Sequence, residues 1–100
     1  MHILIYKRYF MKYYATLQDK LTTSLNPISL DILDESYKHK GHAGYREGLE
    51  THFHVKIVSE HFTDMPKVQR HRLIYKILKQ ELADQIHALA IDAYAPGEIS

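Results

Sequence analysis

Residues 52–94 contain two strand patterns separated by one helix pattern, and this order constrains the fold more than any other feature of the chain. Phe53, Val55 and Ile57 alternate with polar residues, as in a half-buried β-strand. A helix is predicted from about Pro66 to Ala83, with an apolar stripe formed by Leu73, Ile74, Ile77, Leu78 and Leu82. The segment "IHALAIDAY" at residues 86–94 predicts a further strand. A strand–helix–strand connection usually joins parallel neighbours by a right-handed crossover, so we expect the starts of these strands to lie side by side.

The first half of the chain adds a helix, a strand and a long loop. An amphipathic helix is predicted from apolar residues three and four apart, namely Tyr6, Phe10, Tyr13, Leu17 and Leu21. Asn26-Pro27 ends this helix, because proline disfavours helical geometry in the residue before it. Ile28, Leu30 and Ile32 then alternate as in a strand, and the glycine-rich residues 35–50 form a loop. We therefore predict an α+β sandwich in one domain over residues 1–100, with one face of its sheet covered.

Composition narrows the classes of function. The chain has no cysteine, which excludes a disulfide framework, a cysteine-based zinc site and a thiol nucleophile. A formal net charge of +1 does not by itself indicate a nucleic-acid binder. No apolar run is long enough to span a bilayer, so no membrane partner is expected. No group of residues meets the requirements for a nucleophile and its base, so we expect no enzyme.

The loop and the last predicted strand contain three histidines that could bind a metal. His39 and His42 lie in the loop, and His87 lies at the predicted start of the last strand, close to the loop's end if the two strands pair in parallel. Neutral imidazole suits zinc, iron, copper or nickel. No thiolate or clearly placed carboxylate completes a closed site, so a metal here would need ligands from outside the chain. On residue types alone, solvated loop histidines are the favoured alternative.

The predicted helix over residues 66–83 is basic. Arg72, Lys76 and Lys79 share one face at spacings of four and three, and Lys67 and Arg70 lie nearby. Such a stripe could contact the phosphates of a nucleic acid. A solvated helix face explains the same pattern equally well.

Four segments taken together resemble the BolA family over about residues 5–98. They are "LNPISLDILDES", "ETHFHVKIVSEHF", "VQRHRLIYKILKQEL" and "IHALAIDAYAP". The combination of the motifs E-T-H-F, R-H-R and I-H-A-L in this order makes the resemblance quite specific. The fold it implies is a KH-like α-β-β-α-α-β sandwich, with helices packed on one face of a three-stranded sheet.

The resemblance also implies a function. BolA-like proteins are non-catalytic partners of monothiol glutaredoxins in iron–sulfur cluster maturation and trafficking. A [2Fe–2S] cluster would be held with glutaredoxin and glutathione, and none is expected in the isolated chain. The histidine of the I-H-A motif is His87, and the loop ligand corresponds to His39, with His42 as the alternative. Imidazole in place of thiolate on one iron raises the cluster's potential.

Some bacterial members of the family resemble DNA-binding transcriptional regulators, which gives an alternative function. The candidate DNA contacts are Arg70, His71, Arg72 and Lys76. The family's Phe-x-Gly is replaced here by Phe62-Thr63-Asp64, so we expect a different turn before the helix. We expect a cytoplasmic location, with the mitochondrial matrix as the alternative.

Overall fold

The computed structural model of the chain describes residues 12–35, 52–84, 86 and 88–98. Its elements follow the order helix, strand, strand, short 3₁₀ turn, two helices, strand. They are α2 (Lys12–Leu25), β1 (Ser29–Asp34), β2 (His52–Val58), η2 (Glu60–Phe62), α3 (Lys67–Ile77), α4 (Lys79–Ala83) and β3 (Ala88–Tyr94). The predicted α+β class and the α-β-β-α-α-β order are confirmed. In the part of the chain that the structure describes, the helices are too short or too polar to span a bilayer.

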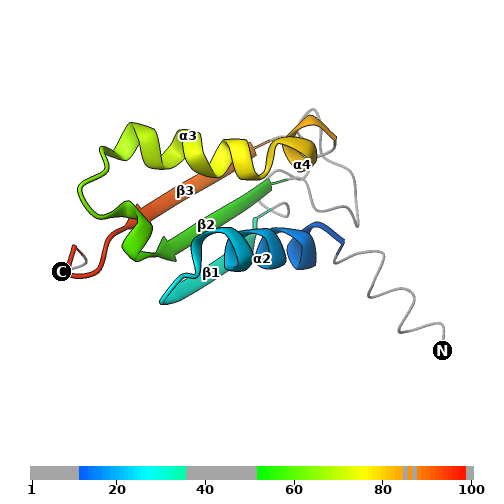
Figure 1. Cartoon of the computed structure of the whole chain (residues 1–100). Helices are drawn as coiled ribbons and strands as arrows, with labels where there is room; N and C mark the ends of the chain where they lie inside the picture. Colours follow the sequence, from blue (N-terminus) through cyan, green and yellow to red (C-terminus); the bar gives the residue numbers. More distant parts are fainter. Residues whose placement is uncertain (1–11, 36–51, 85, 87, 99–100) are drawn as a thin grey trace.

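The three strands form one sheet in the order β1-β2-β3. β1 and β2 pair antiparallel, with Asp34 opposite Phe53. β2 and β3 pair in parallel, with His52 opposite Ala88, as the crossover rule predicts. Helices α2, α3 and α4 all lie on the same face of the sheet (Figure 1). Within the described residues, the other face carries no helix.

The core lies between the sheet and the helices, and most of its members were predicted. Phe53, Val55 and Ile57 of β2 are buried, whereas His52, His54 and Lys56 alternate with them on the open face. The helices contribute buried Tyr13, Leu17, Leu21, Ile74 and Leu78. Ile28 was predicted to share a buried face with Leu30 and Ile32 but is 65% exposed. It precedes β1, whose first residue is Ser29, and so it lies outside the alternation. Tyr6 and Phe10 lie outside the described residues.

One helix ends where the sequence indicates a stop, and a second is interrupted where the sequence predicts that it continues. Asn26 has a φ of 42° directly after α2, and its N–H donates to Thr22 O at 3.0 Å. This is the left-handed residue that commonly follows a helix. The helix predicted from about residue 66 to 83 is interrupted at Leu78, whose φ of −101° and ψ of 20° separate α3 from α4. Leu78 is fully buried, so the interruption lies against the core.

The turn before α3 contains a non-glycine residue in the left-handed region. Asp64 has a φ of 63°, two residues after the buried Phe62. Aspartate tolerates this conformation better than most residues, but glycine adopts it without steric cost. Asp64 occupies the position of the glycine in the family's Phe-x-Gly pattern. This chain therefore carries an aspartate side chain at a position whose backbone conformation suits glycine.

Candidate functional site

One end of the sheet brings together the chain positions next to the predicted metal ligands. Ala88 of β3 pairs with His52 of β2, and the Glu35 N–H donates to His52 O at 2.8 Å. Ile86 is anchored in the core with 5% of its surface exposed. The loop therefore starts after Glu35 and ends before His52, at the end of the sheet where β3 begins. His39, His42 and His87 themselves lie outside the described residues.

The four described histidines are distributed over the molecule. His52 and His54 are half-buried on β2, His71 is half-buried on α3, and His61 is exposed on η2. Within residues 12–35, 52–84, 86 and 88–98, no group of three or more His, Cys, Asp or Glu side chains could hold a metal ion. With no cysteine in the sequence, a cluster at this end of the sheet would need thiolates from another molecule.

The open face of the sheet carries a histidine–carboxylate pair near the same end. Nε2 of His54 lies 2.7 Å from Oδ2 of Asp92 on the neighbouring strand. Because a carboxylate accepts, we assign the shared hydrogen to Nε2, which leaves Nδ1 on the opposite side of the ring. Beside this pair, a hollow of about 370 Å³ is lined by Asp31, Leu33, His54 and Lys56. This face thus combines both signs of charge with an exposed leucine.

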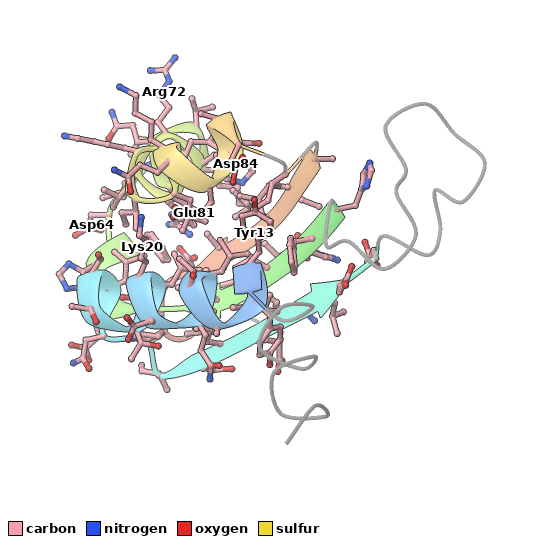
Figure 2. All side chains as sticks on the ribbon, turned by 90° about the vertical axis from the view of Figure 1, so that its right-hand side faces the viewer. Tyr13, Lys20, Asp64, Arg72, Glu81 and Asp84 are labelled. Atoms are coloured by element: carbon pink, nitrogen blue, oxygen red, sulfur yellow. The ribbon has the colours of Figure 1, made fainter. Side chains whose placement is uncertain are left out.

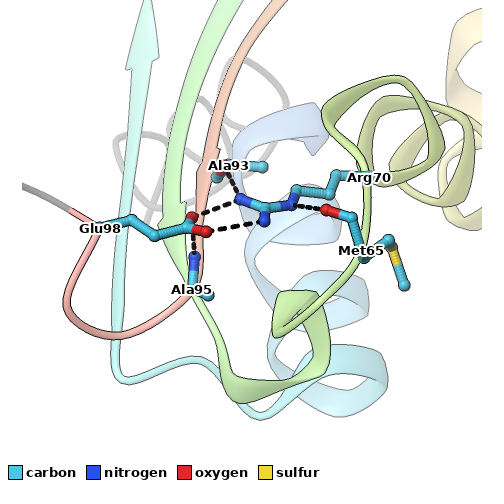
Figure 3. Close-up of polar contacts among 5 residues, drawn as sticks. All are labelled: Met65, Arg70, Ala93, Ala95 and Glu98. Carbon is cyan, nitrogen blue, oxygen red and sulfur yellow. Dashed lines mark hydrogen bonds and ion pairs between the residues drawn. The ribbon is translucent and has the colours of Figure 1, made fainter.

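Arg70 was predicted to contact DNA, but its side chain is enclosed in the fold. It is 4% exposed, and its Nε–H donates to Met65 O at 2.7 Å. Its guanidinium also donates to Ala93 O at 3.0 Å and to both carboxylate oxygens of Glu98, at 2.5 and 2.9 Å (Figure 3). A guanidinium with these partners has no free edge for a phosphate. We therefore correct the expectation: Arg70 is a structural residue and not part of the exposed basic surface.

The carboxylate of Glu98 joins the last turn of the chain to α3 and β3. It accepts from both the Arg70 guanidinium and the Ala95 N–H, the latter at 2.7 Å. The hydrogen bonds from Arg70 and then from Ala95 lower the pKa of Glu98 from 4.5 to about 2. In turn, the hydrogen bond to Glu98 raises the pKa of Arg70. We call Arg70, Glu98 and the carbonyls of Met65 and Ala93 the Arg70 clamp.

The other predicted nucleic-acid contacts lie on the surface of α3. Arg72 and Lys76 are exposed, and Figure 2 shows Arg72 projecting away from the sheet. His71 is half-buried and, with Lys67 and residues of β3 that include Tyr94, lines a cleft of about 220 Å³. The structure thus brings His71, Arg72 and Lys76 onto one helix but excludes Arg70 from its exposed side.

Sequence reasoning missed the His54–Asp92 pair and the Arg70 clamp. The first had a signal, because both residues occupy polar positions of strands predicted to be parallel. The Arg70 clamp had a weaker signal in the sequence. Glu98 follows Pro96-Gly97, a turn that reverses the chain after β3, but no pattern in the sequence pairs Glu98 with Arg70.

Comparison with known proteins supplies the context for this geometry. The profile of the family described as BolA-like protein matches residues 21–98. Protein BOLA1, chloroplastic, of Arabidopsis thaliana is 49% identical over 86 residues, which cover 84% of this chain and 54% of the relative. The DNA-binding transcriptional regulator BolA of Escherichia coli is 41% identical, covering 82% of this chain and 74% of the relative.

Solved structures give the same result for the fold. BolA1 from Arabidopsis thaliana superposes with a TM-score of 0.76 at 45% identity, over 86% of this chain and 94% of that one. The BolA domain of SufE1 from the same plant gives a TM-score of 0.76 at 40% identity, over 85% and 93% of the two chains. Among the full-length relatives, the chain spans 54% of Arabidopsis BOLA1 and 24% of its SufE-like protein 1, chloroplastic/mitochondrial.

Proposed function

The chain belongs to the BolA-like family, and from this premise we propose that it is a non-catalytic adaptor that holds or transfers a [2Fe–2S] cluster together with a monothiol glutaredoxin. The cluster is cargo shared between the two proteins in iron–sulfur protein maturation or iron signalling. His87 and one loop histidine, His39 or His42, would supply imidazole ligands. Glutaredoxin and glutathione would supply the thiolates that this chain lacks.

One observation carries this proposal. The parallel pairing of His52 with Ala88 brings together, at one end of the sheet, the residue that follows the loop and the residue that follows His87. The two segments that contain the proposed ligands are therefore connected to adjacent strands. Imidazole is a known replacement for thiolate on one iron of a [2Fe–2S] centre, so the chemistry of these residues fits the cargo.

A mixing experiment tests the proposal. The isolated chain should be colourless and should not reconstitute a stable cluster, because its histidines are an incomplete ligand set. Adding it to a cluster-loaded monothiol glutaredoxin under anaerobic conditions should change the visible absorption and circular dichroism. A stable cluster on the isolated chain, or an unchanged spectrum on mixing, would contradict the adaptor function.

Duplex-DNA binding through α3 is the competing function. It is favoured by the absence of any acidic residue from α3, and the E. coli relative is named a DNA-binding regulator. With Arg70 enclosed, few cations remain for phosphates, so binding should be weak and should fall steeply with salt. Replacing Arg72 and Lys76 by glutamine should reduce it in a filter or anisotropy assay. Tight, sequence-selective binding at physiological salt would make this the leading function.

The location of the protein stays a prediction. We propose the cytoplasm, with the mitochondrial matrix as the alternative. We also propose that residues 1–100 act as one BolA-like domain.

A further inference from the structure

The outward side of α3 combines exposed apolar and basic residues in one row. Val68 is 60% exposed and Tyr75 is 42% exposed. These residues are seven positions apart, so they lie on the same side of the helix, and Arg72 and Lys76 follow Val68 by four and eight. Both basic residues are exposed. We call Val68, Arg72, Tyr75 and Lys76 the α3 stripe.

The stripe has an unbalanced positive charge. The sequence of α3 contains no acidic residue, and exposed Lys79 continues the positive charge into α4. The salt bridges found within the described residues use Lys20, His54 and Arg70, and none of them uses the cations of the stripe. The Arg70 clamp neutralises the one arginine of α3 that is buried. The stripe therefore presents positive charge toward solvent, where an acidic partner would complement it.

The apolar residues of the stripe distinguish its partner from a phosphate backbone. Phosphate contacts use cations. With about three cations, a plot of the logarithm of the DNA-binding constant against the logarithm of the salt concentration would have a slope of about −3, which is typical of a weak binder. That contact leaves Val68 and Tyr75 without a role. Grooves and faces that bind amphipathic helices, in contrast, use apolar anchors at i, i+3 or i+4, and i+7. The stripe has exposed apolar residues at the two ends of such a span, Val68 at i and Tyr75 at i+7, with Arg72 between them and Lys76 beside them.

Tyr75 has the properties of a preset anchor. Its hydroxyl donates to Leu89 O at 3.3 Å, which holds the ring against the edge of β3. A fixed aromatic ring loses little conformational entropy when a partner packs on it. The 11 residues of α3 extend about 16 Å, which is the length of about three turns of a partner helix. A contact of this length along a single helix suits a weak, reversible complex rather than a permanent one.

We propose that the α3 stripe is a docking surface for an acidic amphipathic helical segment of a partner protein. Apolar side chains of that segment would pack on Val68 and Tyr75, and its carboxylates would face Arg72 and Lys76. The proposal does not depend on the cluster, and its test uses the chain alone. Failure of one proposal therefore leaves the other in place.

The test compares three probes by fluorescence anisotropy. They are a synthetic acidic helical peptide with Leu at an i, i+3, i+7 spacing, a scrambled peptide of the same composition, and a short mixed-sequence DNA duplex. The first peptide should bind more tightly than the second, and amide chemical shifts should change on α3. Equal binding of the two peptides, or no binding of either, would overturn the proposal.

Variants separate apolar from electrostatic recognition. Val68→Ser should weaken binding of the amphipathic peptide about tenfold, because one buried valine contributes about that factor, and it should leave duplex binding unchanged. Val68→Leu should tighten peptide binding. The double change Arg72→Gln with Lys76→Gln should weaken the binding of both the amphipathic peptide and the duplex. Leu33→Ser is the matched control, since Leu33 is 56% exposed on β1. Duplex binding tighter than peptide binding, with no effect of Val68→Ser, would assign the stripe to DNA instead.

Discussion

At the scale of single residues, the guanidinium of Arg70 is an internal group that links α3 to β3 and to Glu98. A sequence pattern records that a residue is basic but not which way its side chain points. Arg70 lies only two positions before the exposed Arg72. Its guanidinium nevertheless points inward, lies 5.9 Å from the centre of the Phe62 ring and forms an ion pair with Glu98. Two arginines of one R-H-R motif thus have different roles, which only the tertiary structure can separate.

The Arg70 clamp predicts a pH dependence of stability. The pKa of Glu98 is lowered from 4.5 to about 2 in the folded chain, so its ionised form stabilises the fold fully above the ordinary value. That contribution is lost as the pH falls from 4.5 through about 2. The wild type should therefore be more stable than Glu98→Gln near neutral pH, and the difference should shrink across this acid range. Urea unfolding over a pH series measures it, with Glu60→Gln on η2 as the control. A difference that is constant with pH would contradict the clamp.

Asp64 predicts a stabilising substitution. Its φ of 63° costs an aspartate conformational energy that a glycine does not pay, so Asp64→Gly should raise the free energy of unfolding by up to about 1 kcal/mol. Asp64→Ala should lower it. Thr63→Gly is the matched control: Thr63 has a φ of −58°, so glycine there adds only unfolded-state entropy and should destabilise. Urea midpoints compare the three variants. Equal losses for Asp64→Gly and Thr63→Gly would show that the left-handed turn imposes no strain.

At the scale of elements, polar contacts join α2 to α4 across the helical layer. The ammonium of Lys20 lies 2.9 and 2.8 Å from the two carboxylate oxygens of Glu81, which is only 8% exposed. The Tyr13 hydroxyl donates to Asp84 in the same region (Figure 2). These contacts fix a five-residue helix that is too short to be stable alone.

A double-mutant cycle tests this connection. Lys20→Ala and Glu81→Ala should show a coupling free energy of about 1 kcal/mol, because the pair is charged and hydrogen-bonded but partly open to solvent. Lys76→Ala with Glu81→Ala should show no coupling, since Lys76 is exposed and the ion pair that the structure gives Glu81 is with Lys20. Thermal or urea unfolding gives both values. A Lys20–Glu81 coupling near zero would mean that apolar packing alone holds α4.

The elements themselves were largely predictable because periodicity reports burial directly. Alternation identified the buried face of β2, and the crossover rule gave the parallel pairing of β2 with β3. The break at Leu78 was not predictable from the pattern of residues 66–83, because its apolar spacing continues through that residue. The break depends on how the buried Leu78 meets the core, which is a tertiary effect.

At the scale of the whole molecule, the sequence predicted that distant segments meet at one end of the sheet. The register of His52 with Ala88 confirms that meeting for the strand ends. The ligand roles of His39, His42 and His87 stay predictions, because those residues lie outside the described part of the chain. Periodicity could not predict the roles of His39 and His42 in any case, because a glycine-rich segment has no repeating apolar pattern on which such an inference could rest.

The proposed adaptor function makes its sharpest prediction about His87. His87→Ala should keep the fold and the complex with apo-glutaredoxin, yet abolish the altered absorption and circular dichroism of the cluster-loaded mixture. His39→Ala should weaken that spectrum more than His42→Ala if the family pattern holds. His61→Ala is the matched control, because His61 is exposed on η2, beyond the opposite end of β2. A folded His87→Ala variant that retains the full wild-type spectrum would remove His87 as a ligand, since a residue that only supports the strand would not change the spectrum without changing the fold.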